Sequence, residues 1–300
     1  MRESKRRDFV DKTLPPSEAV SRFVADGEYV SFDFSSFTRG PLILIREIIR
    51  QARRDLWYCA KFTLMESTLL VGAGACSRID VGFMGLGETL NRAVEEGRVK
   101  VTEWTNGTLT LRHLAAGMGV PFLPTRALLG SDTLKYSGAK VVRDPFGGKP
   151  VALVPALSPD VGLIHVHQAD VYGNARCFGP GVSPLETAMA SRKVIISADE
   201  IVDHDDIRKD PGKTTIPYYL VDAVVYAPFG AYPGGLPGVY EMDHEHFGGY
   251  TALERQGNLK AYLDSYIYSV ESDVEMLEKR VGLARLNGLR RRATVKEGYR

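Results

Sequence analysis

The stretch that decides the fold lies just past the middle of the chain and reads Gly162-Leu-Ile-His-Val-His-Gln-Ala-Asp-Val-Tyr-Gly-Asn174. Its apolar first half is typical of a strand buried on both faces of a parallel sheet, and its Gly-Asn end predicts a turn into a short return strand. His165 and His167 project to the same side of an extended strand, so with Asp170 they could ligate a metal ion. We favour a strand end whose polar side chains meet a loop, because no other His-rich segment lies near in sequence.

On both sides of this strand, short apolar runs alternate with helical patterns. Such alternation predicts βαβ units around an open, mostly parallel sheet flanked by helices, which is an α/β fold, followed by C-terminal helices. We expect strands at 28–34, 56–62, 78–84, 99–104, 151–157, 161–167, 194–197 and 221–226, and helices at 17–24, 41–54, 87–96, 108–118, 184–191 and within 253–286. One domain over 16–288 is expected between basic tails at 1–15 and 289–300.

Composition excludes several classes of protein. The net charge of +1 over 300 residues provides no field that would attract nucleic acid or a membrane surface. No run approaches the roughly 20 apolar residues of a membrane helix, and the basic N-terminus leads into no hydrophobic segment, so we expect no signal peptide. The odd number of cysteines without C-x-x-C spacing fits a reducing cytoplasm; they are Cys59, Cys76 and Cys177.

The central stretch, extended to Pro159, resembles a segment of class I CoA-transferases. The resemblance spreads over most of the chain and is most similar to the A-type subunit of the family's glutaconate branch. It includes Val101-Thr-Glu-Trp-Thr-Asn-Gly-Thr-Leu109, Ala115-Ala-Gly-Met-Gly-Val-Pro-Phe-Leu-Pro124, Glu200-Ile-Val-Asp-His-Asp-Asp-Ile-Arg208 and Val221-Asp-Ala-Val-Val-Tyr-Ala-Pro-Phe-Gly-Ala-Tyr-Pro233. It implies a fold of the CoA-transferase (NagB/RpiA-like) type.

The resemblance also implies how the chemistry is divided. In this family, a glutamate within Ser-Glu-Asn-Gly attacks an acyl-CoA and forms a glutamyl-CoA intermediate, and this segment lies on a β-type subunit. This chain has no such segment, so we expect no catalytic residue here, and an obligatory β-type partner in a hetero-tetramer or hetero-octamer. Coenzyme A would be a substrate together with a small carboxylate, and no other cofactor or metal is expected. Glu66, Glu88 and Glu103 are expected to be solvated or to cap helices.

The first candidate binding loop is Asp26 to Pro41, where the family has adjacent glycines that allow a ligand to approach the backbone. Here Asp33 and Phe34 replace them. Ser35, Ser36 and Arg39 could still bind a carboxylate, Arg39 by a bidentate contact. The alternative is an ordinary loop whose serines cap the next helix.

Two further loops complete the candidate site. The turn Gly82-Phe-Met-Gly-Leu-Gly87 offers Gly82, Phe83, Met84 and Gly85 for contact with a ligand or a partner chain. Asn106-Gly107 stands where the family often has Gln-Gly, and its amide could donate to a carboxylate, whereas the alternative is a cap of the helix that follows.

Two other functions stay open. Steroid ring-opening CoA-ester hydrolases resemble the chain too, but they carry a glutamate close to the Asn106 position. An aromatic cluster at Tyr232, Tyr240 and His244–Phe247 could shape a bulky substrate pocket or be ordinary surface packing. A ligand-sensing module of a transcription regulator would need a DNA-binding segment, and the basic tails show no helix-turn-helix pattern.

Overall fold

The structure is a computed structural model that describes residues 8–33, 37–84, 87–179 and 181–293. Its centre is a parallel sheet with the strand order β11-β10-β8-β1-β2-β3-β4, and the short β9 pairs antiparallel with β8. The strands are β1 Tyr29–Phe32, β2 Leu56–Ala60, β3 Cys76–Val81, β4 Lys100–Glu103, β8 Val161–Ala169, β9 Ala175–Arg176, β10 Lys193–Ile201 and β11 Ala223–Tyr226. The predicted α/β fold is confirmed, and the stretch quoted first forms β8 in the middle of the sheet.

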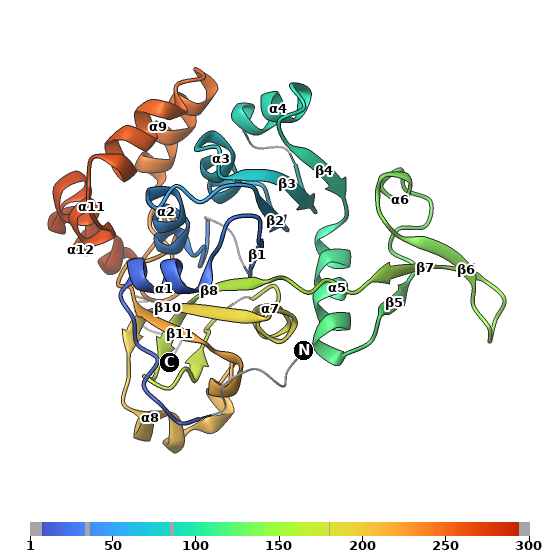
Figure 1. Ribbon diagram of the computed structural model, residues 1–300. Coiled ribbons are helices and arrows are strands. Elements are labelled where there is room, and N and C mark those ends of the chain that lie inside the picture. The colour runs from blue at the N-terminus through green and yellow to red at the C-terminus, as the bar shows by residue number, and fades with distance from the viewer. Residues whose placement is uncertain (1–7, 34–36, 85–86, 180, 294–300) are drawn as a thin grey trace.

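Helices cover both faces of this sheet (Figure 1). One face buries β-strand residues such as Val30 and Leu163 under α1 Pro16–Phe23, α2 Leu42–Arg50, α3 Met65–Gly72, α4 Glu88–Glu95, α9 His244–Arg255 and α10 Leu259–Leu263. The other face packs against α5 Asn106–Met118 and α7 Pro184–Ala190. Of these, α3 escaped sequence analysis, and α9 begins ahead of the predicted helical region.

The remaining elements lie at the edges. They are α8 His204–Lys209, the 3-10 turns Pro211–Lys213 and Tyr218–Leu220, the π-helical segments Asp264–Tyr268 and Leu277–Val281, and the helices α11 Asp273–Met276 and α12 Leu283–Ala293. Leu289 is buried within α12, so the predicted C-terminal tail begins as a packed helix. Thr13 forms a bridge to Val224, so part of the predicted N-terminal tail lies against the edge strand.

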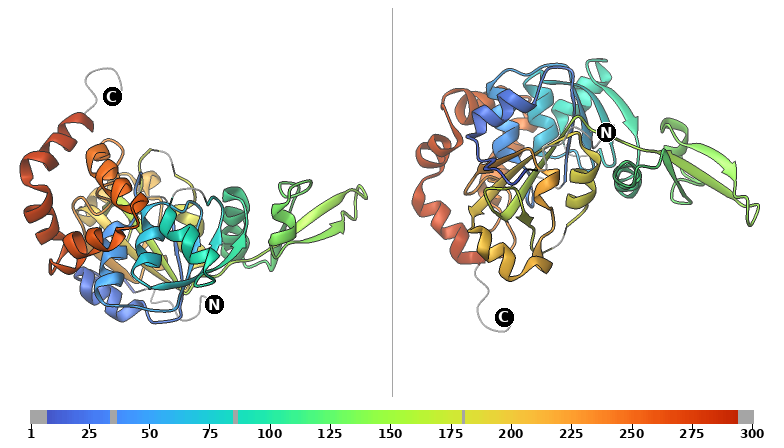
Figure 2. Two further views of the ribbon diagram at one scale, coloured as in Figure 1. Left: turned by 90° about the horizontal axis from the view of Figure 1, so that it is seen from above. Right: turned by 60° about the horizontal axis from the view of Figure 1, so that its bottom comes forward.

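One prediction about strands is wrong. The run at 151–157 was expected in the parallel sheet, but it forms β7 Pro150–Pro155, the middle strand of a separate antiparallel sheet with β5 Phe122–Thr125 and β6 Lys140–Arg143. With α6 Thr133–Tyr136, this sheet projects from the body as an arm (Figures 1 and 2). Only alternate residues of β7 are buried, because one face of the arm packs inward and the other meets solvent.

Candidate functional site

The loops that follow β1, β2, β3 and β4 meet at the carboxyl edge of the parallel sheet, which is where open α/β sheets bind ligands. The predicted site residues Arg39, Gly82, Phe83, Met84, Asn106 and Gly107 all lie in or next to these loops. Ser35, Ser36 and Gly85 lie outside the described residues. The side chains of Phe83 and Met84 are exposed, as expected of groups that a ligand or a second chain would cover.

Gly82 and Asn106 are brought face to face. A Cβ atom at Gly82 would lie 2.2 Å from Asn106 Oδ1 and 2.7 Å from the Asn106 backbone nitrogen. The alternative for Asn106, a cap for the helix, is wrong, because α5 is capped by Thr105, whose hydroxyl accepts from Thr108 N at 3.0 Å. Asn106 Oδ1 is buried and has no hydrogen-bond partner among the described residues. The side-chain amide is therefore held in place by contact with a glycine and is not used by the helix.

Asp33, which stands at a family glycine, is tied into the protein. Its carboxylate accepts from Ser183 N at 2.8 Å and lies 3.3 Å from Arg39 Nη1, and both charged side chains are almost wholly buried. Arg39 has a φ of 54°, a left-handed conformation that non-glycine residues rarely adopt. Since the guanidinium is engaged by Asp33, Arg39 anchors the loop after β1, and its contact with a substrate carboxylate stays a prediction.

Lys61 is a charged residue at this edge that sequence analysis missed. It follows β2 and is 1% exposed; its ammonium donates to Ser183 Oγ and lies 3.4 Å from Thr187 Oγ1. Burial lowers the pKa of Lys61, and the charge of Asp33 acts in the opposite direction. The available signal was a single lysine at the end of the apolar run 56–62.

The three glutamates considered from sequence have different environments. Glu66 is fully buried in the first turn of α3, so the expectation that it is solvated is wrong. Glu88 is exposed and pairs with Arg92 at 3.1 Å, and Glu103 is the exposed last residue of β4. That the reactive glutamate lies on another chain stays a prediction.

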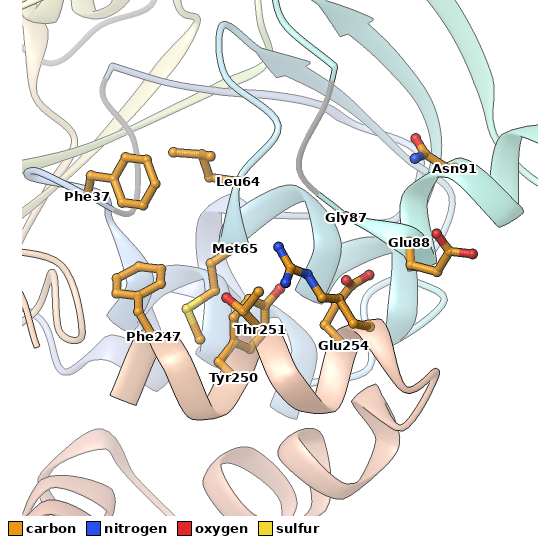
Figure 3. A pocket seen from close by; sticks show the side chains of 11 residues that line it. Phe37, Leu64, Met65, Gly87, Glu88, Asn91, Phe247, Tyr250, Thr251 and Glu254 are labelled. Atoms are coloured by element: carbon orange, nitrogen blue, oxygen red, sulfur yellow. The ribbon is translucent and has the colours of Figure 1, made fainter. Parts of the chain in front are cut away.

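A cavity of about 300 Å³ opens beside these loops and is lined on one side by α9 (Figure 3). Its size is at the lower end of the range for small-molecule sites. One wall is apolar, and Figure 3 shows Phe37, Leu64 and Phe247 on the side away from Glu88 and Asn91. The full lining is Phe37, Leu64, Met65, Gly87, Glu88, Asn91, Phe247, Tyr250, Thr251, Glu254 and Arg255.

α9 is fixed to the neighbouring helices α4 and α10 by polar contacts. Glu254 is buried and accepts from Thr89 N at 2.5 Å, at the start of α4. His246 Nε2 lies 2.8 Å from the Tyr262 hydroxyl. Tyr232 and Tyr240 are buried, so the alternative that the aromatic cluster is surface packing is wrong for these two. Phe247 is the member of the cluster that lines the cavity.

The histidines of β8 have partners of their own. His165 Nδ1 lies 3.0 Å from Ser197 Oγ, whereas His167 accepts from Phe178 N and contacts Pro237 O at 3.0 Å. Burial lowers the pKa of His165 to about 3 and that of His167 to about 4, so both are neutral near pH 7.

Asp170 serves the turn after β8. It accepts from Asn174 Nδ2 and lies 2.7 Å from His204 Nδ1. Over the described ranges, no group of three or more His, Cys, Asp or Glu side chains is placed to hold a metal ion. Over the same ranges, every helix is too short or too polar to cross a bilayer.

Known proteins share this architecture. The A-type subunit of glutaconate CoA-transferase from Acidaminococcus fermentans is 26% identical over 94% of this chain and 95% of its own. The crystal structure of that enzyme superposes with a TM-score of 0.87 over 93% of this chain and 95% of its own. The A-type subunit of 3-oxoadipate CoA-transferase from Pseudomonas knackmussii is 32% identical over 87% of this chain and 95% of its own.

A relative with a different reaction also matches. The IpdA subunit of the cholesterol ring-cleaving hydrolase from Rhodococcus jostii is 29% identical over 74% of this chain and 80% of its own. The sequence profile of the coenzyme A transferase family matches residues 14–227. With the parallel sheet and the loops at its carboxyl edge, this match shows that the chain belongs to the coenzyme A transferase family.

Proposed function

We propose that this chain is the A-type subunit of a two-chain enzyme that moves coenzyme A from an acyl-CoA to a carboxylate. The observation that carries the proposal is the close approach of Gly82 to Asn106 at the carboxyl edge of the sheet, where the amide oxygen of Asn106 is buried and has no hydrogen-bond partner among the described residues. The two CoA-transferase relatives are named as A-type subunits, which supports a B-type partner for this chain.

The reaction needs a nucleophilic carboxylate, which we assign to a glutamate of the B-type chain. That carboxylate attacks the thioester carbonyl, the C–S bond breaks, and an acyl-glutamyl anhydride and the CoA thiolate result. The thiolate then attacks the glutamyl carbonyl, which releases the first carboxylate and leaves a glutamyl-CoA thioester. The acceptor carboxylate repeats the two steps in reverse. Covalent catalysis divides one difficult exchange into these easier steps.

Each step passes through a tetrahedral oxyanion, and this chain would stabilise it. The Asn106 amide can donate a hydrogen bond to that oxygen, and one such donor lowers the barrier by about 3–4 kcal/mol. The apolar wall of the cavity, with Phe37 and Phe247, would receive the acyl chain. The polar wall of the cavity carries both signs of charge, from Glu88, Glu254 and Arg255. Because a positive group could bind a second carboxylate and the negative groups would repel it, acceptors with one and with two carboxylates are both to be assayed.

The test uses the co-purified A-type and B-type chains incubated with acyl-CoA and then with borohydride, which reduces a glutamyl thioester to an alcohol. Peptide mass spectrometry should find the reduced glutamate on the B-type chain after acyl-CoA treatment and in no peptide of this chain. Reduction of a glutamate on this chain would refute the division of roles. Hydrolysis of a cyclic CoA ester, with no transfer of CoA to an added carboxylate, would establish the hydrolase function instead.

A further inference from the structure

The arm formed by β5, β6, β7 and α6 presents apolar side chains to solvent. All four residues of β6 are exposed, and Val141 and Val142 are 49% and 40% exposed. Phe146, in the turn between β6 and β7, is 99% exposed. Met118, Phe122 and Tyr136 are exposed at the base of the arm and on α6. A projection this small and this apolar is typical of a surface that another chain covers.

β6 is also an open edge. It pairs with β7 on one side, and in the part of the chain that the structure describes no strand lies on its other side. Arg143 lies opposite Pro150, which has no N–H, so this is a non-hydrogen-bonded pair. By alternation, Lys140 and Val142 direct their backbone groups toward β7, whereas Val141 and Arg143 direct theirs outward. An exposed edge of this kind is a template for pairing with another strand.

We propose that β6 pairs antiparallel with β6 of a second copy of this chain, about a two-fold axis that passes at Val142. In an antiparallel ladder, two opposed residues either both direct their backbone groups toward each other or both direct them away. Neighbouring residues of one strand alternate in this respect, so a residue cannot oppose its own neighbour in the second copy. A two-fold axis must therefore lie where a residue opposes the same residue of the second copy. When the axis passes at Val142, the outward backbone N–H and C=O groups of Val141 face those of Arg143 of the second copy. These groups form the hydrogen bonds of the ladder between the copies.

Charge selects this register. With the axis at Val142, Lys140 opposes Asp144 of the second copy, and symmetry creates this ion pair twice. With the axis at Val141, Arg143 would instead oppose Ala139, and Lys140 would oppose Val142. Opposite charges directly across a ladder stabilise it. Asp144 already accepts from Phe146 N and Gly147 N in its own turn, which orients the carboxylate, and its remaining lone pairs can accept from a lysine.

The contact is self-complementary, as a closed two-fold interface requires, and it would join two arms into one continuous antiparallel sheet. The arm extends on the side of the molecule away from α9 (Figure 1). The interface between copies would therefore lie away from α9 and from the cavity that α9 lines. The proposal concerns assembly and does not depend on which reaction the protein catalyses.

The test is disulfide formation between copies at two adjacent positions, Val142→Cys and Val141→Cys, in the full chain purified with whatever chain accompanies it. In the proposed register, the two cysteines of the Val142→Cys variant form a non-hydrogen-bonded pair with about 4.5 Å between Cα atoms, within the range that a disulfide spans. The two cysteines of the Val141→Cys variant are offset by two positions from each other, roughly 9 Å apart, and cannot be bridged.

Mild oxidation should convert Val142→Cys to a species of twice the 33.1 kDa chain mass on a non-reducing gel. The matched variant Val141→Cys should give at least tenfold less. The unsubstituted chain should too, and it measures any background from the partly exposed Cys177, since Cys59 and Cys76 are buried. Equal cross-linking of both variants would refute the register. Cross-linking of neither variant, as expected if a different chain covers the arm, would refute the pairing of copies.

Discussion

Replacement of Gly82 by alanine tests the candidate site most directly. The added methyl carbon would lie 2.2 Å from Asn106 Oδ1, 2.7 Å from Asn106 N and 2.9 Å from Asn106 Cα. Two of these three atoms belong to the backbone of the first turn of α5, so rotation of a side chain cannot relieve the clash. We expect the start of α5 to move, at a cost of about 1–3 kcal/mol in the free energy of unfolding.

The displaced amide should also lower activity. If Asn106 donates to the oxyanion, its loss reduces kcat by about 10²–10³-fold, and Asn106→Ala should show a similar loss without the clash. The double variant should keep part of the stability penalty of Gly82→Ala, because the contacts with backbone N and Cα persist while the contact with Oδ1 is removed. Turnover by the co-purified chains and urea unfolding measure the two effects separately.

Gly248→Ala is the matched control. Gly248 is an exposed residue of α9, and an added Cβ would have nothing within 4 Å. Alanine is favoured over glycine inside a helix by roughly 0.5–1 kcal/mol, so this variant should be slightly more stable and fully active. The reasoning is refuted if Gly82→Ala unfolds at the same urea concentration as the unsubstituted chain and keeps its kcat.

Three further predictions follow from particular contacts. Asp33→Asn should lower the free energy of unfolding by about 3–5 kcal/mol, because it removes the carboxylate charge that faces the buried Arg39 guanidinium. The control Asp132→Asn removes a charge from an exposed ion pair and should lower it by less than about 1 kcal/mol. Equal losses of stability in urea titrations of the two variants would contradict this prediction. Thr251→Phe should fill the cavity that Thr251 lines and raise KM for acyl-CoA about tenfold; an unchanged KM would exclude the cavity as the acyl site. Burial lowers the pKa of His246 to about 4 in the folded chain. Between pH 6.5 and 4, His246 therefore binds a proton in the unfolded chain but not in the folded chain. Stability should therefore fall by up to roughly 3 kcal/mol between pH 6.5 and 4 on account of His246, and His246→Asn should show a shallower fall; identical slopes in pH-dependent urea unfolding would argue against it.

Much of the strand and helix order was predictable because its signals are local. β8 and β1 are short apolar runs, and α4 is amphipathic and ends before Gly97. α3 was missed because it is buried on every side, so it has no polar stripe and no helical period. The run at 151–157 has the composition of a buried strand, but composition does not say which sheet a strand joins.

The sequence by itself determined the α/β class, the place of β8, and a set of loops that carry glycines, an amide and charges. Only the tertiary structure decided that Gly82 touches Asn106, that Asp33 is paired with Arg39, and that Lys61 meets Ser183 across 122 positions of sequence. It also decided that α9, from the far end of the chain, lines one side of the cavity. The physical reason is that secondary structure follows local periodicity and turn chemistry, whereas such contacts depend on how whole elements pack, and one sequence carries no direct record of that packing.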